Sequence, residues 1–319
     1  MSKGVIGWAV ALIAAAALPF VLTNNYYLHL MIMIAINSML ALGLNLILGF
    51  VGDKSLGHAS FFGIGAYAGA LIAFATNGNV VYTTIGAAVI AGVASIAIGY
   101  PVLKLRGPYF AIVTLGFCLI MQLVASNWVE LTGGPMGLPG IPSAKLIAGG
   151  TTILEGVDEQ DYWYITFAGA ALLYLLSRSI ERTSLGRILT ALKENYNLSE
   201  AVGINPFHIK MAAFVIGAAF AGVAGSLYAH YTGFISPKVF DTLLNVNIVT
   251  MVIIGGEATS SGPVLGAMVV TLLPEALRFA EGFRLLIFGV ILLAVIMFAP
   301  KGLLGLVTTL RSKIRKEAA

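Results

Sequence analysis

Charged side chains are scarce in this chain. Only 10% of its 319 residues are charged, 14 of them acidic, whereas 59% are hydrophobic and the mean hydropathy is +0.94. A soluble protein of this length needs far more charge to cover its surface. The composition therefore excludes a soluble domain and indicates a polytopic membrane protein, in which each span takes about 20 mostly apolar residues.

Cysteine is almost absent, and no pattern of catalytic or metal-binding residues is present. The one cysteine, Cys118, lies in an apolar run, can form no internal disulfide and is predicted to be inert packing. The histidines never stand at metal-ligand spacing, so they are predicted to have scattered packing or interface roles; they are His29, His58, His208 and His230. No Ser-His-Asp or Cys-His arrangement is suggested. We therefore expect neither an enzyme nor a metal site.

A phosphate-binding loop is also missing. The motif Gly-x-x-x-x-Gly-Lys-Ser/Thr occurs nowhere in the sequence. If the protein works with ATP, another polypeptide must bind it. The net charge of +4 does not indicate nucleic-acid binding, because the basic residues lie at the ends of apolar runs, where they set membrane orientation.

Long apolar runs dominate what is present. There are ten, at 5–22, 28–51, 56–75, 80–103, 109–127, 162–180, 211–233, 244–256, 263–277 and 284–299. Those at 56–75 and 244–277 are short or interrupted by glycine, which makes them candidates for re-entrant half-helices. The first run also resembles a signal peptide, although a retained span balances the topology better. We predict an all-α transmembrane bundle of about 8–10 spans, with residues 1–319 forming one domain.

The distribution of Lys and Arg predicts the orientation. With the N-terminus inside and each run crossing once, only four of the 18 basic residues lie outside, and they are Lys145, Lys238, Arg278 and Arg284. Cytoplasmic loops carry such an excess of basic residues. Both termini, the tail 300–319 and the loop 185–210 are thus predicted to be cytoplasmic. The Gly/Pro-rich loop 128–161 is predicted to lie outside, with no helix in 131–142.

The loop 185–210 is the most polar part of the chain. Its first half, Gly186–Asn195, places Ile188, Leu189 and Leu192 on one helical face. A short amphipathic helix on the inner membrane face is predicted. A solvated connector is the alternative, but a short rigid helix fused to long spans can act as a lever.

The second half of that loop reads Leu-Ser-Glu-Ala-Val-Gly-Ile-Asn-Pro. Ser199 is predicted to cap a helix that has Glu200 and Ala201 in its first turn. Gly203 permits a left-handed or tight backbone, and Pro206 cannot continue the turn. These residues predict a sharp stop before the next span.

Two glycine-rich segments are candidates for a transport pathway or gate. Ser55–Gly69 combines small residues with sparse polar groups, and its candidates are Ser55, Gly57, His58, Ser60, Gly65 and Tyr67. A tightly packed helix, which Gly65-x-x-x-Gly69 also favours, is the alternative. Gly255–Gly266 interrupts an apolar stretch as a cytoplasmic turn or a re-entrant tip. It contributes Gly255 and Gly256 as gate candidates, with Glu257 either contacting a partner or solvated.

Several stretches resemble one family. The segment "EAVGIN" resembles the coupling loop of ABC-importer permeases, which docks on the ATPase subunit. Most of residues 40–305 resembles the branched-chain amino-acid ABC transporter permeases, of the kind paired with a second, different permease. The stretches are 44–72, 103–117, 131–142, 191–214, 221–240, 251–267 and 299–305. The sequence departs from the family at 255–259, where Gly-Gly-x-Gly-Ser is usual, and at 299–302, where Arg-Pro-Arg-Gly is usual.

The resemblance implies a function and a set of partners. It implies an ABC-importer permease fold in the bacterial inner membrane, moving branched-chain amino acids, with a second permease and a periplasmic binding protein at loop 128–161. Two ATPase subunits would hold ATP and Mg²⁺, with no cofactor on this chain, and would contact Glu200, Ala201, Val202, Gly203, Ile204, Asn205 and Pro206. Urea, short amides or other small amino acids are alternative solutes. An ion-coupled secondary transporter and a membrane scaffold are less favoured classes.

Overall fold

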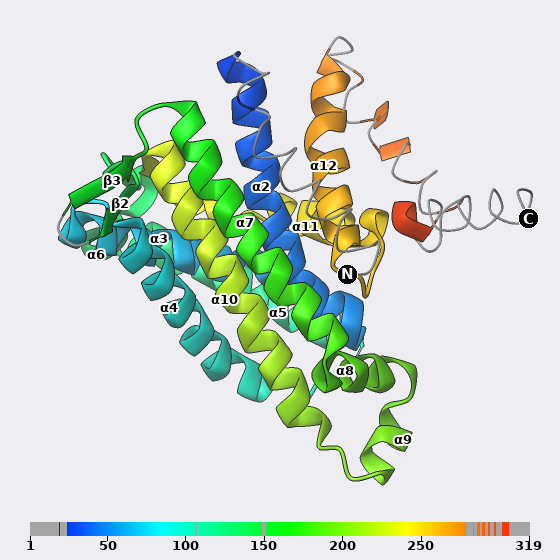
Figure 1. Ribbon diagram of the computed structural model, residues 1–319. Coiled ribbons are helices and arrows are strands. Elements are labelled where there is room, and N and C mark those ends of the chain that lie inside the picture. The colour runs from blue at the N-terminus through cyan, green and yellow to red at the C-terminus, as the bar shows by residue number, and fades with distance from the viewer. Residues whose placement is uncertain are drawn as a thin grey trace, which may run out of the picture.

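The computed structural model describes residues 24–105, 107–148 and 151–278 without a break, together with Pro19 and short pieces beyond Arg278. The predicted spans 5–22 and 284–299 and the tail 300–319 lie outside this part of the chain, apart from isolated residues. Within it the protein is a bundle of helices, which confirms the predicted fold class (Figure 1).

Six helices are long and apolar enough to cross a membrane. They are α2 (Asn25–Asn45) with the π-helical turn η1 (Leu46–Val51), α3 (His58–Thr76), α4 (Val80–Val102), α5 (Pro108–Asn127), α7 (Glu159–Arg182) and α10 (Pro206–Thr232). A rise of about 1.5 Å per residue gives each of them roughly the length of the hydrocarbon layer or more. They coincide with the apolar runs predicted between 28 and 233.

Two further apolar helices are shorter. These are α11 (Thr242–Gly255) and α12 (Ser261–Ala276), of 14 and 16 residues, so each measures only about 21–24 Å. They form a hairpin. At its tip the two backbone segments are in close contact, since a Cβ on Gly255 would lie 1.8 Å from the carbonyl oxygen of Gly262. A re-entrant role for α11 and α12 stays a prediction. The same prediction for the run 56–75 was wrong, because α3 is long enough to cross a membrane.

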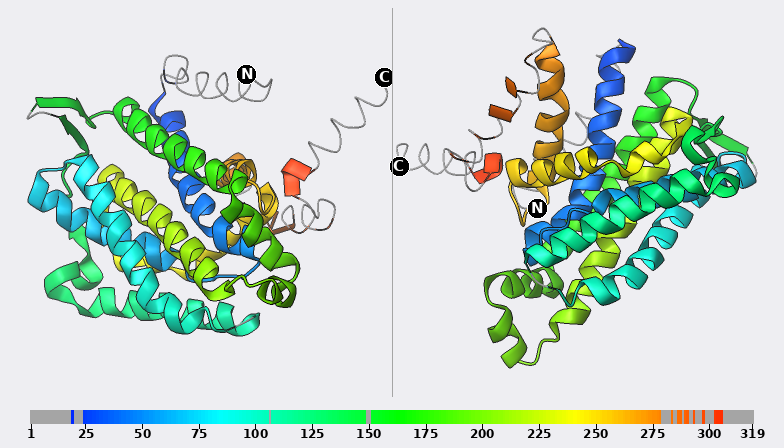
Figure 2. Two further views of the ribbon diagram at one scale, coloured as in Figure 1. Left: turned by 60° about the horizontal axis from the view of Figure 1, so that its bottom comes forward. Right: turned by 180° about the vertical axis from the view of Figure 1, so that it is seen from behind.

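Helix α10 lies at the centre of the bundle, between α2, α3 and α4 (Figure 2). Glycine makes these contacts close. A Cβ on Gly65 of α3 would lie 2.3 Å from the Cα of Gly222, and one on Gly43 of α2 would lie 2.5 Å from the carbonyl oxygen of Gly217. In a membrane, association depends on such backbone contact because lipid removes the hydrophobic drive between helices.

Short elements occupy both ends of the bundle. One end carries α8 (Ser184–Glu194) and α9 (Tyr196–Ala201), and the other carries α6 (Val129–Thr132), one 3₁₀ turn and four short strands. A second 3₁₀ turn leads back into the bundle, where the thiol of Cys118 donates to the carbonyl of Phe240. The turns are η2 (Gly134–Met136) and η3 (Pro237–Phe240); the antiparallel pairs are β1 (Leu138–Pro139) with β4 (Phe234–Ile235) and β2 (Lys145–Ala148) with β3 (Thr151–Glu155). The prediction of a helix-free loop at 131–142 was wrong, because α6 extends to Thr132 and the 3₁₀ turn η2 forms within the loop.

Candidate functional site

The polar loop folds into two short helices that project from the bundle between α7 and α10 (Figure 1). We call residues 184–205 the arm and this side of the protein the arm end. Leu189 and Leu192 of α8 are buried, and Ile188 is half-buried. This confirms the predicted apolar face, which holds α8 against the bundle.

Helix α9 begins earlier than predicted. The side chain of Asn195 caps it by accepting a hydrogen bond from the amide of Leu198 at 3.0 Å. Ser199 lies inside the helix, where its hydroxyl donates to the carbonyl of Asn195, and Glu200 is in the last turn. The prediction that Ser199 caps the helix was therefore wrong. Asn and Ser are equally good caps, so the local pattern could not choose between them.

The stop after α9 is built as the sequence predicts. Gly203 has a φ of +85°, the left-handed conformation that ends many helices. Its amide donates to the carbonyl of Glu200 at 3.0 Å. Two residues later the side chain of Asn205 caps α10 by accepting from the amide of Phe207, and Pro206 is the first residue of that helix. Helix α9 is thus joined to α10 by a tight connection of four residues, 202–205.

The residues predicted to contact an ATPase lie together at the tip of the arm. Val202 is 68% exposed and Leu198 beside it is 61% exposed. The other residues predicted for this contact are exposed too, except Ile204, which is half-buried, and Pro206, which is buried. A Cβ on Gly203 would meet nothing within 4 Å. The tip is therefore free to meet another surface, and the ATPase contact itself stays a prediction.

Lys193, near the end of α8, fastens the arm to two other elements. Its ammonium group lies 2.7 Å from a carboxylate oxygen of Glu257 and donates to the carbonyl of Gly49 at 2.9 Å. Gly49 belongs to η1, and Glu257 lies at the tip of the α11–α12 hairpin. Glu257 is thus paired within this chain and is not a purely solvated charge.

The hairpin tip is held from two more sides. The side-chain amide of Asn45 donates to the carbonyl of Thr259 at 2.9 Å and accepts from the amide of Ala258 at 3.2 Å. Glu181 of α7 accepts from both the amide and the hydroxyl of Ser260, at 3.1 and 2.6 Å. Ala258 itself has a φ of +57°, which is unusual for a residue with a side chain. Side chains of α2, α7 and α8 therefore set the conformation of this tip.

A second ion pair ties α10 to the turn after η1. The ammonium group of Lys210 lies 2.6 Å from a carboxylate oxygen of Asp53, and the two side chains are only 7% and 14% exposed. Burying a charge in this way costs much less free energy when it is paired with an opposite charge. The two residues lie 157 positions apart in the sequence.

The pathway candidates of α3 are packed tightly. Ser55, Gly57, His58, Ser60 and Tyr67 are all buried. A Cβ on Gly57 would lie 2.3 Å from the carbonyl oxygen of Thr114. Within the described part of the chain, the Nε2 of His58 and the hydroxyls of Ser60 and Tyr67 have no hydrogen-bond partner. The packing agrees with the alternative of a close-packed helix, and a pathway role for α3 stays a prediction.

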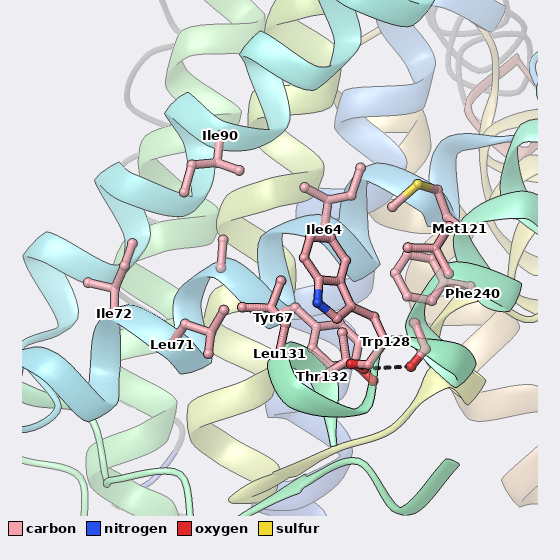
Figure 3. A pocket seen from close by; sticks show the side chains of 13 residues that line it. Ile64, Tyr67, Leu71, Ile72, Ile90, Met121, Trp128, Leu131, Thr132 and Phe240 are labelled. Carbon is pink, nitrogen blue, oxygen red and sulfur yellow. Dashed lines mark hydrogen bonds between the residues drawn. The ribbon is translucent and has the colours of Figure 1, made fainter. Parts of the chain in front are cut away.

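Tyr67 borders an apolar cavity of about 280 Å³ between α3, α4 and α5 (Figure 3). Its ring stacks on Phe240, with centroids 6.0 Å apart. Trp128 forms part of the wall and is 52% exposed, and Thr132 donates to the carbonyl of Ala125 at 2.6 Å. Because the lining is almost wholly hydrocarbon, this cavity suits an apolar group rather than a charged solute.

His230 and Cys118 take part in internal hydrogen bonds. The ring nitrogens of His230 lie 2.8 Å from the carbonyl of Pro142 and 2.9 Å from the hydroxyl of Thr83. The sulfur of Cys118 accepts from the side chain of Asn245 at 3.1 Å. Among the described residues no three potential metal ligands come together. The contacts of His230 and Cys118 agree with the packing roles predicted for them.

The contacts around the hairpin tip were not found by sequence reasoning. Lys193 was counted only as one of many inner charges, and Glu181 and Asn45 were not singled out. One signal was available: Asn45 interrupts an apolar run, and a polar residue within a span usually has a partner. The identity of that partner, more than 200 residues away, is visible only in the fold.

Comparisons with known proteins agree with this architecture. The family model described as "Branched-chain amino acid transport system / permease component" matches residues 26–300. The chain is 33% identical to the LivM permease of Escherichia coli, covering 97% of this chain and 76% of that protein. It is 26% identical to the LivH permease of Salmonella typhimurium, covering 84% and 91%. No solved structure gives a significant match. The chain belongs to the permease family of branched-chain amino-acid transport systems.

Proposed function

We propose that this chain is one of two different permease subunits of an ATP-driven importer of branched-chain amino acids in a bacterial inner membrane. The arm end and both chain termini face the cytoplasm. Two ATPase subunits bind ATP and Mg²⁺ and contact the arm, and a periplasmic binding protein delivers solute to the opposite end, over loop 128–161. Similarity to relatives named LivM and LivH supports the solute class and the pairing of two permeases.

One observation carries the coupling part of this proposal: the arm is exposed at one end and fastened at the other. Residues 198–203 are mostly open to a partner, and Lys193 joins α8 to the hairpin tip. A movement of the arm, driven by closing of the ATPase subunits, would therefore displace Gly255 and Gly256, where the two segments of the hairpin lie close together. Such rigid, discrete connections can carry force between distant sites.

The alternatives fit the sequence less well. An ion-coupled transporter places ionisable side chains within its spans, whereas α2, α3, α4 and α5 contain no Asp, Glu, Lys or Arg at all. A scaffold has no need of an arm linked to a helix hairpin. A permease for urea or short amides shares the same coupling parts and differs only in the solute.

A matched pair of glycine variants tests the coupling role. Gly203 and Gly233 both follow a helix, at φ +85° and +63°, and a Cβ on either meets nothing within 4 Å. Replacing either by Asp should cost a similar backbone strain of about 1 kcal/mol. We expect Gly203→Asp to abolish uptake and solute-stimulated ATP hydrolysis while the chain still inserts, because its side chain intrudes on the docking surface.

Gly233→Asp is the control, since Gly233 lies at the opposite end of α10. It should leave co-purification of the ATPase subunits unchanged. Normal uptake by Gly203→Asp, or equal loss of ATPase subunits from both variants, would contradict the proposal. A cysteine at position 200 gives a direct check: it should crosslink to an ATPase subunit, and Cys118, the one native thiol of this chain, is buried.

A further inference from the structure

A second cavity, of about 480 Å³, lies among α2, the end of α10, η3 and the start of α11. We call it the vestibule. Its lining includes Tyr228, four residues before the end of α10, and Lys238 and Asp241, which follow that helix. Since α10 runs from the arm to the other end of the bundle (Figure 1), the vestibule lies toward the end opposite the arm. Its volume is in the range of small-molecule sites.

The vestibule has an apolar wall and a polar rim. The wall includes Ile36, Phe62 and Val239, which are 1%, 4% and 9% exposed. The rim carries one basic and one acidic side chain, Lys238 and Asp241, both exposed. An apolar surface next to two opposite charges is unlike the cavity beside Tyr67, whose lining is almost wholly hydrocarbon.

Both rim charges are available to a ligand. In the part of the chain that the structure describes, neither Lys238 nor Asp241 takes part in an ion pair. One carboxylate oxygen of Asp241 caps α11 by accepting from the amide of Leu243 at 3.2 Å. Its second oxygen remains free to accept a hydrogen bond from a cation.

The vestibule is also connected to the arm. Leu244 of α11 lines it, and the same helix ends at Gly255, beside the tip that Lys193 holds. A movement of the arm that displaces the tip would thus move one wall of the vestibule. This is the connection that a transporter needs between its solute site and its motor.

We propose that the vestibule binds the solute as a zwitterionic amino acid with an apolar side chain. The carboxylate faces Lys238, the ammonium group faces Asp241, and the side chain lies on the wall formed by Ile36, Phe62 and Val239. This inference rests on the proposed function and deepens it. It favours an amino acid over urea or a short amide, because a zwitterion adds charge attraction at both rim groups, whereas an uncharged solute gains only hydrogen bonds there.

Equilibrium binding to the complete transporter in lipid nanodiscs, without the binding protein, tests the assignment. The probes are leucine, leucinol, which lacks the carboxylate, and 4-methylpentanoate, which lacks the ammonium group. Lys238→Gln should weaken leucine binding about tenfold and leave leucinol binding unchanged. Asp241→Asn should weaken leucine binding about tenfold and leave 4-methylpentanoate binding unchanged, and Asn preserves the helix cap.

Lys145→Gln is the control, because Lys145 lies at the same end of the bundle but pairs with Glu155; its leucine binding should equal that of the wild type. Equal weakening of leucine and leucinol by Lys238→Gln would show a merely structural role and overturn the assignment. No leucine binding by the wild type would overturn it as well.

A separate uptake assay distinguishes the two proposals. If the wild type and both rim variants import leucine with ATP at the same maximal rate and the same half-saturating concentration, the vestibule assignment fails and the proposed function stands. If the wild-type complex hydrolyses ATP but imports no amino acid, the proposed function fails, and the vestibule assignment fails with it.

Discussion

The contact between Lys193 and the hairpin tip should decide how much solute is moved per ATP. The change to make is Lys193→Met, which removes the ammonium group and keeps an unbranched apolar stem. That stem runs close to Gly52, since a Cβ there would lie 3.0 Å from the Cγ of Lys193. The variant therefore tests the polar contacts with Glu257 and Gly49 while the packing of α8 is preserved.

The size of the effect follows from the exposure of the pair. The side chains of Lys193 and Glu257 are 33% and 38% exposed, so their ion pair contributes up to about 1 kcal/mol. The hydrogen bond from the ammonium group to the carbonyl of Gly49 adds about 1 kcal/mol after solvent competition. Losing both contacts weakens the attachment of the arm to the hairpin by about 1.5–2 kcal/mol. This corresponds to about 10–30-fold in the equilibrium constant between the attached and detached states.

The assay is the ratio of solute imported to ATP hydrolysed, in proteoliposomes that contain the whole transporter. Lys193→Met should lower this ratio about tenfold and leave the rate of ATP hydrolysis nearly unchanged, because the docking tip of the arm is untouched. In a double-mutant cycle with Glu257→Gln, the two effects should fall short of additivity by about 0.5–1 kcal/mol.

The control is Lys145→Met, which breaks a pair of similar geometry. Lys145 lies 2.9 Å from Glu155, with side-chain exposures of 23% and 43%, at the end of the bundle away from the arm. Because Lys145 lies in loop 128–161, where the binding protein is proposed to dock, the assay uses a saturating concentration of binding protein, and the ratio of import to hydrolysis should then match that of the wild type. An unchanged ratio in Lys193→Met, or an equal fall in both variants, would refute the reasoning.

Two predictions concern stability, measured as the thermal midpoint of the purified protein. Gly65→Ala should destabilise it by about 1–3 kcal/mol, because the new methyl group would lie 2.3 Å from the Cα of Gly222; Gly116→Ala, with nothing within 4 Å, should lose nothing. Lys210→Met should destabilise by about 3–5 kcal/mol, because it leaves the mostly buried Asp53 unpaired. Asp53→Asn in the same chain should recover part of that loss, and no recovery would contradict the pairing argument.

Local sequence signals were sufficient for the helices and for the turns between them. Six of the ten predicted apolar runs coincide with the long helices, because a span in lipid must satisfy its backbone internally and present apolar side chains for about 20 residues. Gly203 and Pro206 likewise marked the end of the arm, since their backbone preferences act within a few residues. The start of α9 was misplaced because Asn195 and Ser199 compete as caps of equal strength.

What a sequence determines without its fold is therefore whatever depends on neighbours along the chain: the membrane class, the spans, the arm and its apolar face. The tertiary structure alone decided which distant groups meet, such as Lys193 with Glu257, Lys210 with Asp53, and Lys238 with the wall of the vestibule. A charge has no preferred partner until packing brings one within hydrogen-bonding distance. In this protein that packing depends on glycine contacts between helices far apart in the chain.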